Sequence, residues 1–228
     1  MSFLDDLKKQ ADALRSRQEV DETTFLRNAQ ATDAACKATF LYWLELAKQL
    51  EVIRPPVRVR YEFAARHALD GPADGLRFSE FRCDARRKIQ RGVELYDHVV
   101  ASCWVRGGRR MTIDRDFPTE IERLRARLQQ AGITAPSHIV RDDATGRFVA
   151  ERYEFDADVR VGARLTPDHE NGRLEFTAMN FDGLESTVVE FPAAAVDTAL
   201  LDELAKWWLG EPHRFTSSGK IVRLIDPR

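Results

Sequence analysis

The clearest pattern in the sequence is an alternation of apolar and polar residues between Phe148 and Leu165. Every second residue from Tyr153 to Leu165 is apolar, and from Arg152 onward the residues between them are charged apart from one glycine. Side chains alternate between the two faces of a β-strand, so this stretch predicts a strand with one apolar and one solvated face. It is far longer than the usual strand of about 6 residues, and we therefore expect it to curve, with its apolar face concave and covered by helices.

The solvated face of this predicted strand carries three carboxylates in a row, Glu154, Asp156 and Asp158. Such a row would suit a divalent cation if a neighbouring strand added a ligand. We favour a ladder of ion pairs with arginines of the same strand and of adjacent strands, because opposite charges on one sheet face stabilise each other.

The N-terminal region shows apolar residues at helical spacing instead. Leu7 and Leu14 belong to a short amphipathic helix, and after a polar break Asp21 can cap a second helix that runs to about Val52. Two prolines follow, and the residue before a proline disfavours helix. We predict that residues 1–54 form a helical hairpin packed on the body of the protein.

The remainder reads as two β-rich units, residues 55–132 and 133–228. In each unit we predict a hairpin turn, at Gly107–Gly108 and at Asp182–Gly183, then a strand, a Phe-Pro pair and a helix. The predicted fold class is α+β, with an N-terminal helical hairpin followed by an antiparallel sheet built from two successive β-rich units, each closed by a helix packed on the curved sheet. This pseudo-twofold arrangement favours one compact domain, and two loosely joined domains are the alternative.

The charge of the chain is small overall but unevenly distributed. The 228 residues have a net charge of −2, residues 57–115 have 13 basic and 8 acidic residues, and residues 116–228 have 14 and 20. The small total does not favour nucleic acid or a membrane surface as a partner. The opposite signs of the two regions suit an internal docking of the units or a head-to-tail contact between subunits.

The three cysteines, Cys36, Cys83 and Cys103, are far apart in the sequence. An odd and sparse set of this kind is typical of free buried thiols in a reducing compartment. The N-terminus carries acids where a secretory signal needs basic residues, and no apolar run is long enough to span a membrane. We expect a soluble cytoplasmic protein of the bacterial type.

Catalytic motifs are missing from the sequence. It contains no GxGxxG, HExxH or GxSxG pattern and no metal-spaced set of cysteines. We therefore predict no catalytic residue, no metal and no cofactor, and the sequence leans away from an enzyme.

One candidate ligand site lies in the predicted strand 94–106. Tyr96, His98 and Trp104 share one face of that strand, and a histidine beside two aromatic rings would suit a small-ligand pocket. The competing interpretation is a hydrogen-bonded histidine with a purely structural role.

A second candidate is the one basic cluster of the chain, Arg86, Arg87, Lys88 and Arg91. Guanidinium groups beside phenylalanines would suit phosphate or RNA, although no RNA-binding motif accompanies them. Trp208, beside another tryptophan at a helix end, is a third candidate, because an indole outside the core suits a protein partner.

These observations favour a non-enzymatic protein-interaction or adaptor protein that self-associates, with an unknown protein partner. A small-ligand-binding protein or enzyme with a pocket between the curved sheet and its helices is the alternative. RNA or phosphate binding through the cluster Arg86–Arg91 is a third possibility.

Overall fold

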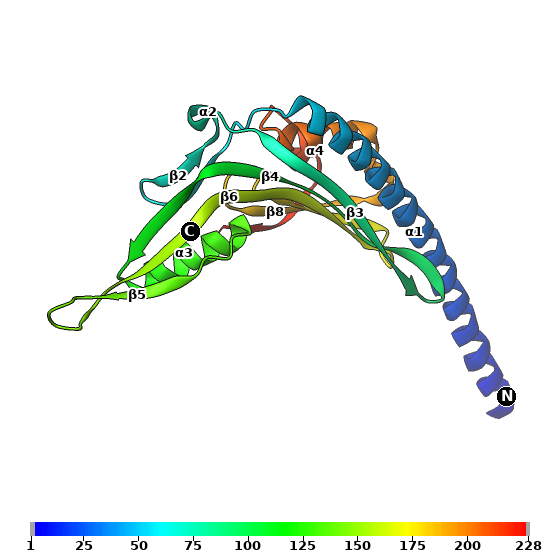
Figure 1. Ribbon diagram of the computed structural model, residues 1–228. Helices are drawn as coiled ribbons and strands as arrows, with labels where there is room; N and C mark the ends of the chain where they lie inside the picture. Colours follow the sequence, from blue (N-terminus) through cyan, green and yellow to red (C-terminus); the bar gives the residue numbers. More distant parts are fainter. Residues whose placement is uncertain (1–2, 227–228) are drawn as a thin grey trace.

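The computed structural model describes the backbone of residues 3–226 and their side chains, except those of residues 3–6, 13 and 16–18. Figure 1 shows one long helix followed by an arched sheet with shorter helices. The predicted α+β class with an antiparallel sheet is confirmed. In chain order the elements are α1 (Phe3–Ile53), β1 (Arg60–Ala64), β2 (His67–Asp70), α2 (Gly71–Asp74), β3 (Phe78–Gln90), β4 (Val93–Arg115), α3 (Pro118–Ala131), β5 (Ser137–Arg141), β6 (Phe148–Asp168), β7 (Arg173–Met179), β8 (Ser186–Pro192), the 3₁₀ turn η1 (Ala193–Ala195), α4 (Thr198–Trp208), α5 (Phe215–Ser218) and β9 (Lys220–Ile225).

The predicted N-terminal hairpin is wrong, because residues 3–53 form the single continuous helix α1. The polar run from Arg15 to Val20, which suggested a break, contains neither glycine nor proline. Its residue types cost an α-helix only a few tenths of a kcal/mol each, about 0.7 at most. The helix therefore continues through them and ends just before Pro55.

The main sheet has seven strands in the order β3-β4-β6-β7-β8-β9, with β5 paired to the first part of β6, and every pairing is antiparallel. β1 and β2 form a separate hairpin. β4 and β6 have 23 and 21 residues, and Figure 1 shows them following the whole arch. The long curved strand predicted from Phe148 onward is confirmed.

Gly107–Gly108 does not form the predicted hairpin turn, because β4 runs straight through it. The pairing of β4 with β6 shifts register between Arg106 and Arg110, so the two glycines form a bulge. A Cβ atom on Gly107 would lie 2.1 Å from the Ala157 carbonyl oxygen, which shows how closely the strands approach there. The resemblance between the two β-rich units is thereby reduced to a strand followed by a helix.

The apolar residues of β6 define the buried face of the sheet. At one end, Trp43 of α1 contacts Phe176, the cross-strand neighbour of Leu165, with ring centroids 6.4 Å apart. At the other end, Arg125 of α3 donates a hydrogen bond to the Tyr153 hydroxyl. Helices at both ends thus cover the same strand face, as the alternation pattern requires.

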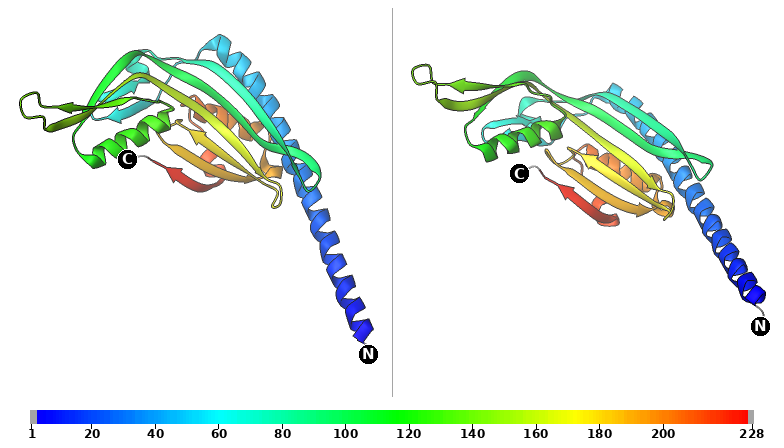
Figure 2. Two further views of the ribbon diagram at one scale, coloured as in Figure 1. Left: turned by 60° about the horizontal axis from the view of Figure 1, so that its bottom comes forward. Right: turned by 90° about the horizontal axis from the view of Figure 1, so that it is seen from below.

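The opposite, polar face of the sheet is open to solvent over the half that lies beneath α1. Figure 1 shows α1 and α4 on the outer, convex side of the arch, so the predicted helix-covered apolar face is convex here and not concave as expected. Figure 2 views the molecule from below, where β3, β4 and β6 lie in front of α1 and no helix of residues 3–226 covers this half. We call this surface the concave face.

Candidate interaction surfaces

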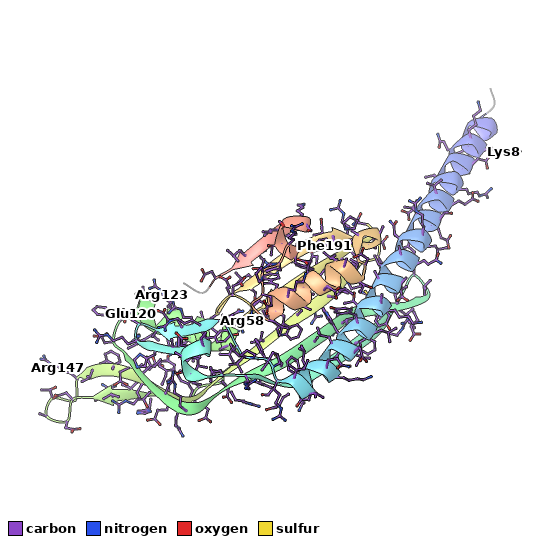
Figure 3. All side chains as sticks on the ribbon, turned by 90° about the horizontal axis from the view of Figure 1, so that it is seen from above. Lys8, Arg58, Glu120, Arg123, Arg147 and Phe191 are labelled. Carbon is purple, nitrogen blue, oxygen red and sulfur yellow. The ribbon has the colours of Figure 1, made fainter. Side chains whose placement is uncertain are left out.

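The first unusual surface is the N-terminal part of α1, which extends past the sheet into solvent. Figure 3 shows Lys8 near the free end of the helix, away from all strands. All described side chains from Leu7 to Glu22 are exposed, and the first buried one is Phe25. We call residues 7–20 the α1 projection.

The apolar stripe that attaches α1 to the sheet continues along the α1 projection. Trp43, Phe25 and Leu7 are eighteen residues apart, and eighteen residues make about five turns at roughly 3.6 residues per turn. The three side chains therefore point in the same direction. Trp43 and Phe25 are 1% and 2% exposed, whereas Leu7 is 46% exposed and Leu14, on the same stripe, is 59% exposed.

A buried histidine fixes the point where α1 meets the sheet. His169, in the turn after β6, is 2% exposed. Its Nδ1 lies 2.7 Å from the Thr32 hydroxyl of α1, and its Nε2 lies 2.8 Å from the Tyr96 carbonyl oxygen of β4. Asn28 of α1 also donates to the backbone of the same turn, at 2.7 Å from the Glu170 carbonyl oxygen. These contacts hold α1 from residue 28 onward.

The other half of the polar sheet face, far from α1, is a ladder of ion pairs. Arg152 donates two hydrogen bonds of 2.7 Å to Asp114, and this guanidinium lowers the pKa of the carboxyl. Asp158 accepts from Arg106 at 2.6 Å, and Glu154 from an arginine of β4 at 3.4 Å. The predicted ladder of ion pairs is confirmed for Glu154 and Asp158, whereas Asp156 forms no ion pair with the described residues.

The basic cluster near the β3–β4 turn is largely neutralised. Arg91 donates to Asp21 at 2.9 Å and to Glu170 at 2.8 Å. Lys88 lies 3.2 Å from Asp97.

Arg87, a further member of that cluster, contacts Asp33 and Glu94 and lies 4.5 Å above the Tyr96 ring. Only Arg86 has no carboxylate within 4 Å among the described residues.

The candidate ligand residues are not gathered around one cavity. Tyr96 is buried beneath Arg87, and its backbone contacts His169. The His98 Nδ1 lies 2.8 Å from an oxygen of the neighbouring Asp97, which supports a structural role. Trp104 borders a polar hollow of about 290 Å³ that neither Tyr96 nor His98 lines.

Trp208, the predicted partner contact, is 2% exposed. Its indole stacks on Phe181 with ring centroids 5.3 Å apart and lies 6.3 Å from Phe81. The adjacent Trp207 donates a hydrogen bond to Asp182 at 2.7 Å. Both indoles belong to the core between α4 and the sheet, where neither is accessible to a partner.

Ionisable groups in the described part of the chain form no candidate metal centre. No group of three or more His, Cys, Asp or Glu side chains among them is arranged to hold a metal ion. Burial raises the pKa of the Cys36 and Cys103 thiols to about 12, which makes them inert rather than nucleophilic.

The fold and these surfaces define an α+β protein with a projecting helix and one open sheet face. No family model matches the sequence, and no curated protein and no solved structure is significantly similar to it. No helix among residues 3–226 is long and apolar enough to cross a membrane.

Proposed function

We propose that the protein is a non-enzymatic interaction protein of the cytoplasm that self-associates through the α1 projection. The observation that carries the proposal is the continuation of the sheet-binding stripe into a helix segment that the chain itself leaves uncovered. An isolated helix of fewer than about 15 residues is marginal in water, since helices in proteins gain most stability from packing an amphipathic face. The α1 projection extends a helix whose packed part is already nucleated, and its exposed apolar stripe would gain stability from a partner surface.

A second copy of the chain fits this surface in one orientation. The free stripe and the sheet lie on the same side of α1. A partner helix that ran parallel to α1 along this stripe would therefore collide with the sheet of the first copy. An antiparallel partner helix ends before it reaches that sheet, and the sheet of the second copy lies beyond the free end of α1 of the first copy.

The expected stabilisation follows from the exposed leucines. Full burial of a leucine contributes roughly 2 kcal/mol, so covering the exposed half of Leu7 or Leu14 contributes about 1 kcal/mol. A symmetric dimer contains four such side chains, which gives about 4 kcal/mol, or roughly a thousandfold in the dissociation constant.

Sedimentation velocity over a concentration series tests the proposal. We expect the wild-type chain to associate reversibly, and the variant Leu7→Glu/Leu14→Glu to sediment as a 26.1 kDa monomer at every concentration. Val20→Glu is the matched control, because Val20 is 66% exposed on the same segment but lies about 140° away from the stripe. A wild-type chain that is monomeric throughout, or a Val20 variant that dissociates as readily as the leucine variant, would overturn the proposal.

The small-ligand alternative predicts a different result. Native mass spectrometry would then show a reproducible added mass that His98→Ala removes. The separation of Tyr96, His98 and Trp104 described above is the reason that we place this function second.

A further inference from the structure

We propose that the concave face binds single-stranded nucleic acid along β4, with arginines of β3 and β6 holding the phosphates. This activity goes beyond self-association and uses none of the residues of the α1 projection. It shares only Arg86 with the basic cluster near the β3–β4 turn, because Arg87, Lys88 and Arg91 of that cluster are engaged in ion pairs.

Strand register places four arginines on this face. Arg82 pairs with Ser102 and Arg86 with His98, so the two arginines form a row on β3. Arg160 pairs with Trp104 and Arg164 with Val100, so they form a second row on β6, on the other side of β4. The rows are about 10 Å apart, and the arginines within a row about 13 Å. The four residues are Arg82, Arg86, Arg160 and Arg164.

These arginines differ from the others on the concave face because no carboxylate of the described residues lies within 4 Å of them. Arg160 has only a 3.3 Å contact with the Ser102 hydroxyl, and Arg164 a 3.4 Å contact with the Thr166 hydroxyl. Asp84 is the one acid between the β3 arginines, and its side chain accepts a hydrogen bond from a backbone N–H of its own strand. With Asp84 and with Glu175, the polar-face residue of β7 diagonal to Arg164, the four arginines leave a net positive charge of about +2 at neutral pH.

Short residues lie along the middle of this surface, which we call the trough. They are Val100 and Ser102 on β4 and Gly162, beside Ser102, on β6. The arginines on either side are longer and exposed, and the Arg160 guanidinium reaches the Ser102 hydroxyl at 3.3 Å. Figure 2 shows no helix over β3, β4 and β6 where they lie beneath α1, whereas at Arg160 the end of α3 lies close, since a Cβ atom on Gly132 would be 3.1 Å from the Arg160 Cβ.

An aromatic side chain at one end of the trough favours nucleic acid over an acidic protein segment. Trp104 is half-buried, and the Arg106 guanidinium lies 4.6 Å from its ring centroid. Nucleobases stack on indole rings and on guanidinium planes in the same way, at roughly 1–3 kcal/mol per base. An acidic peptide would use the arginines but would gain little from this stack.

Fluorescence anisotropy with a labelled oligouridylate tests the inference on the full-length protein. Four phosphate contacts predict a slope of log K against log salt of about −3, and Arg160→Gln/Arg164→Gln is expected to halve that slope and weaken binding at least about tenfold. Arg110→Gln/Arg152→Gln is the matched control, because it removes two charges from the same face that are already paired with Glu154 and Asp114. The control is expected to bind within about twofold of the wild type.

Two further measurements separate the possible ligands. Trp104→Leu is expected to weaken oligouridylate binding at least about fivefold, as the loss of one base stack predicts. Polyglutamate of the same total charge is expected to displace the labelled oligouridylate only poorly. Unchanged oligouridylate binding in Arg160→Gln/Arg164→Gln would overturn the inference. Competition by polyglutamate as strong as that by unlabelled oligouridylate, together with unchanged binding in Trp104→Leu, would also overturn it and would assign the face to acidic protein segments.

The test is independent of self-association. Leu7→Glu/Leu14→Glu is expected to leave the affinity per chain and its salt slope unchanged, so a failure of the proposed function and a failure of this inference give different results.

Discussion

The buried histidine at the junction of α1 and the sheet gives the most specific prediction for stability. His169→Ala removes both ring contacts, with the Thr32 hydroxyl at 2.7 Å and the Tyr96 carbonyl oxygen at 2.8 Å. Each lost hydrogen bond costs about 1 kcal/mol, and the cavity left by a side chain that is 2% exposed adds at least as much. We therefore expect the free energy of unfolding to fall by about 3 kcal/mol.

Urea unfolding followed by tryptophan fluorescence measures this change, because Trp43 lies on α1, the helix that contacts His169 through Thr32, and is 1% exposed. His98→Ala is the matched control, since the only hydrogen bond of the His98 side chain to the described residues is with the adjacent Asp97. We expect this control to lose about 1 kcal/mol or less. A His169 variant no less stable than the His98 variant would show that the junction does not hold α1 as the structure indicates.

Three further results are expected. Cys36 and Cys103 are buried, and burial raises the pKa of both thiols to about 12, so Ellman's reagent at pH 8 should detect these two only after denaturation, and prompt reaction of more than one thiol in the native protein would contradict their burial. Gly162→Ala should destabilise the protein by about 2 kcal/mol in urea unfolding, because the new Cβ would lie 2.5 Å from a backbone oxygen of β4, and an unchanged midpoint would refute that close approach. The Arg152 guanidinium lowers the pKa of Asp114 in the folded state, so the stability from this pair is present at neutral pH and is lost as the pH falls below about 4. Asp114→Asn should therefore lose less stability on acidification than the wild type, by at most about 1 kcal/mol. A variant that loses more stability on acidification than the wild type would contradict the lowered pKa of Asp114.

The long strand β6 could be predicted from the sequence because its signal is local. Alternation with a period of two assigns each side chain to a face whatever the partner strands are. The residues expected on the apolar face, such as Val159 and Val161, are fully buried. The length of the alternating stretch also required curvature, and the structure shows it.

The two errors in the fold concern features that local signals do not determine. The polar run between Leu14 and Asp21 is compatible with helix and with a turn, and its tertiary surroundings decide between them. Gly107–Gly108 permits positive φ angles, and Gly108 does adopt φ 63°. The same conformational freedom serves a bulge within a strand as well as a hairpin turn, so paired glycines alone do not distinguish the two.

The candidate surfaces were harder to predict because the pairing of charges is long-range. Arg91 looked available in the sequence, but its carboxylate partners are 70 and 79 residues away. The arginines of the trough come from separate strands and form no cluster in the sequence. Arg160 and Arg164 do lie in the polar set of the alternating stretch, and this was the available signal that they share an exposed face.

The central claim is that the α1 projection is a helix because a second copy covers it. Amide hydrogen exchange of residues 7–20, measured by mass spectrometry at several protein concentrations, tests this most directly. The account predicts that protection of this segment rises with concentration in the wild type and is absent in Leu7→Glu/Leu14→Glu. Protection that does not depend on concentration, or a segment that exchanges freely at every concentration, would contradict it.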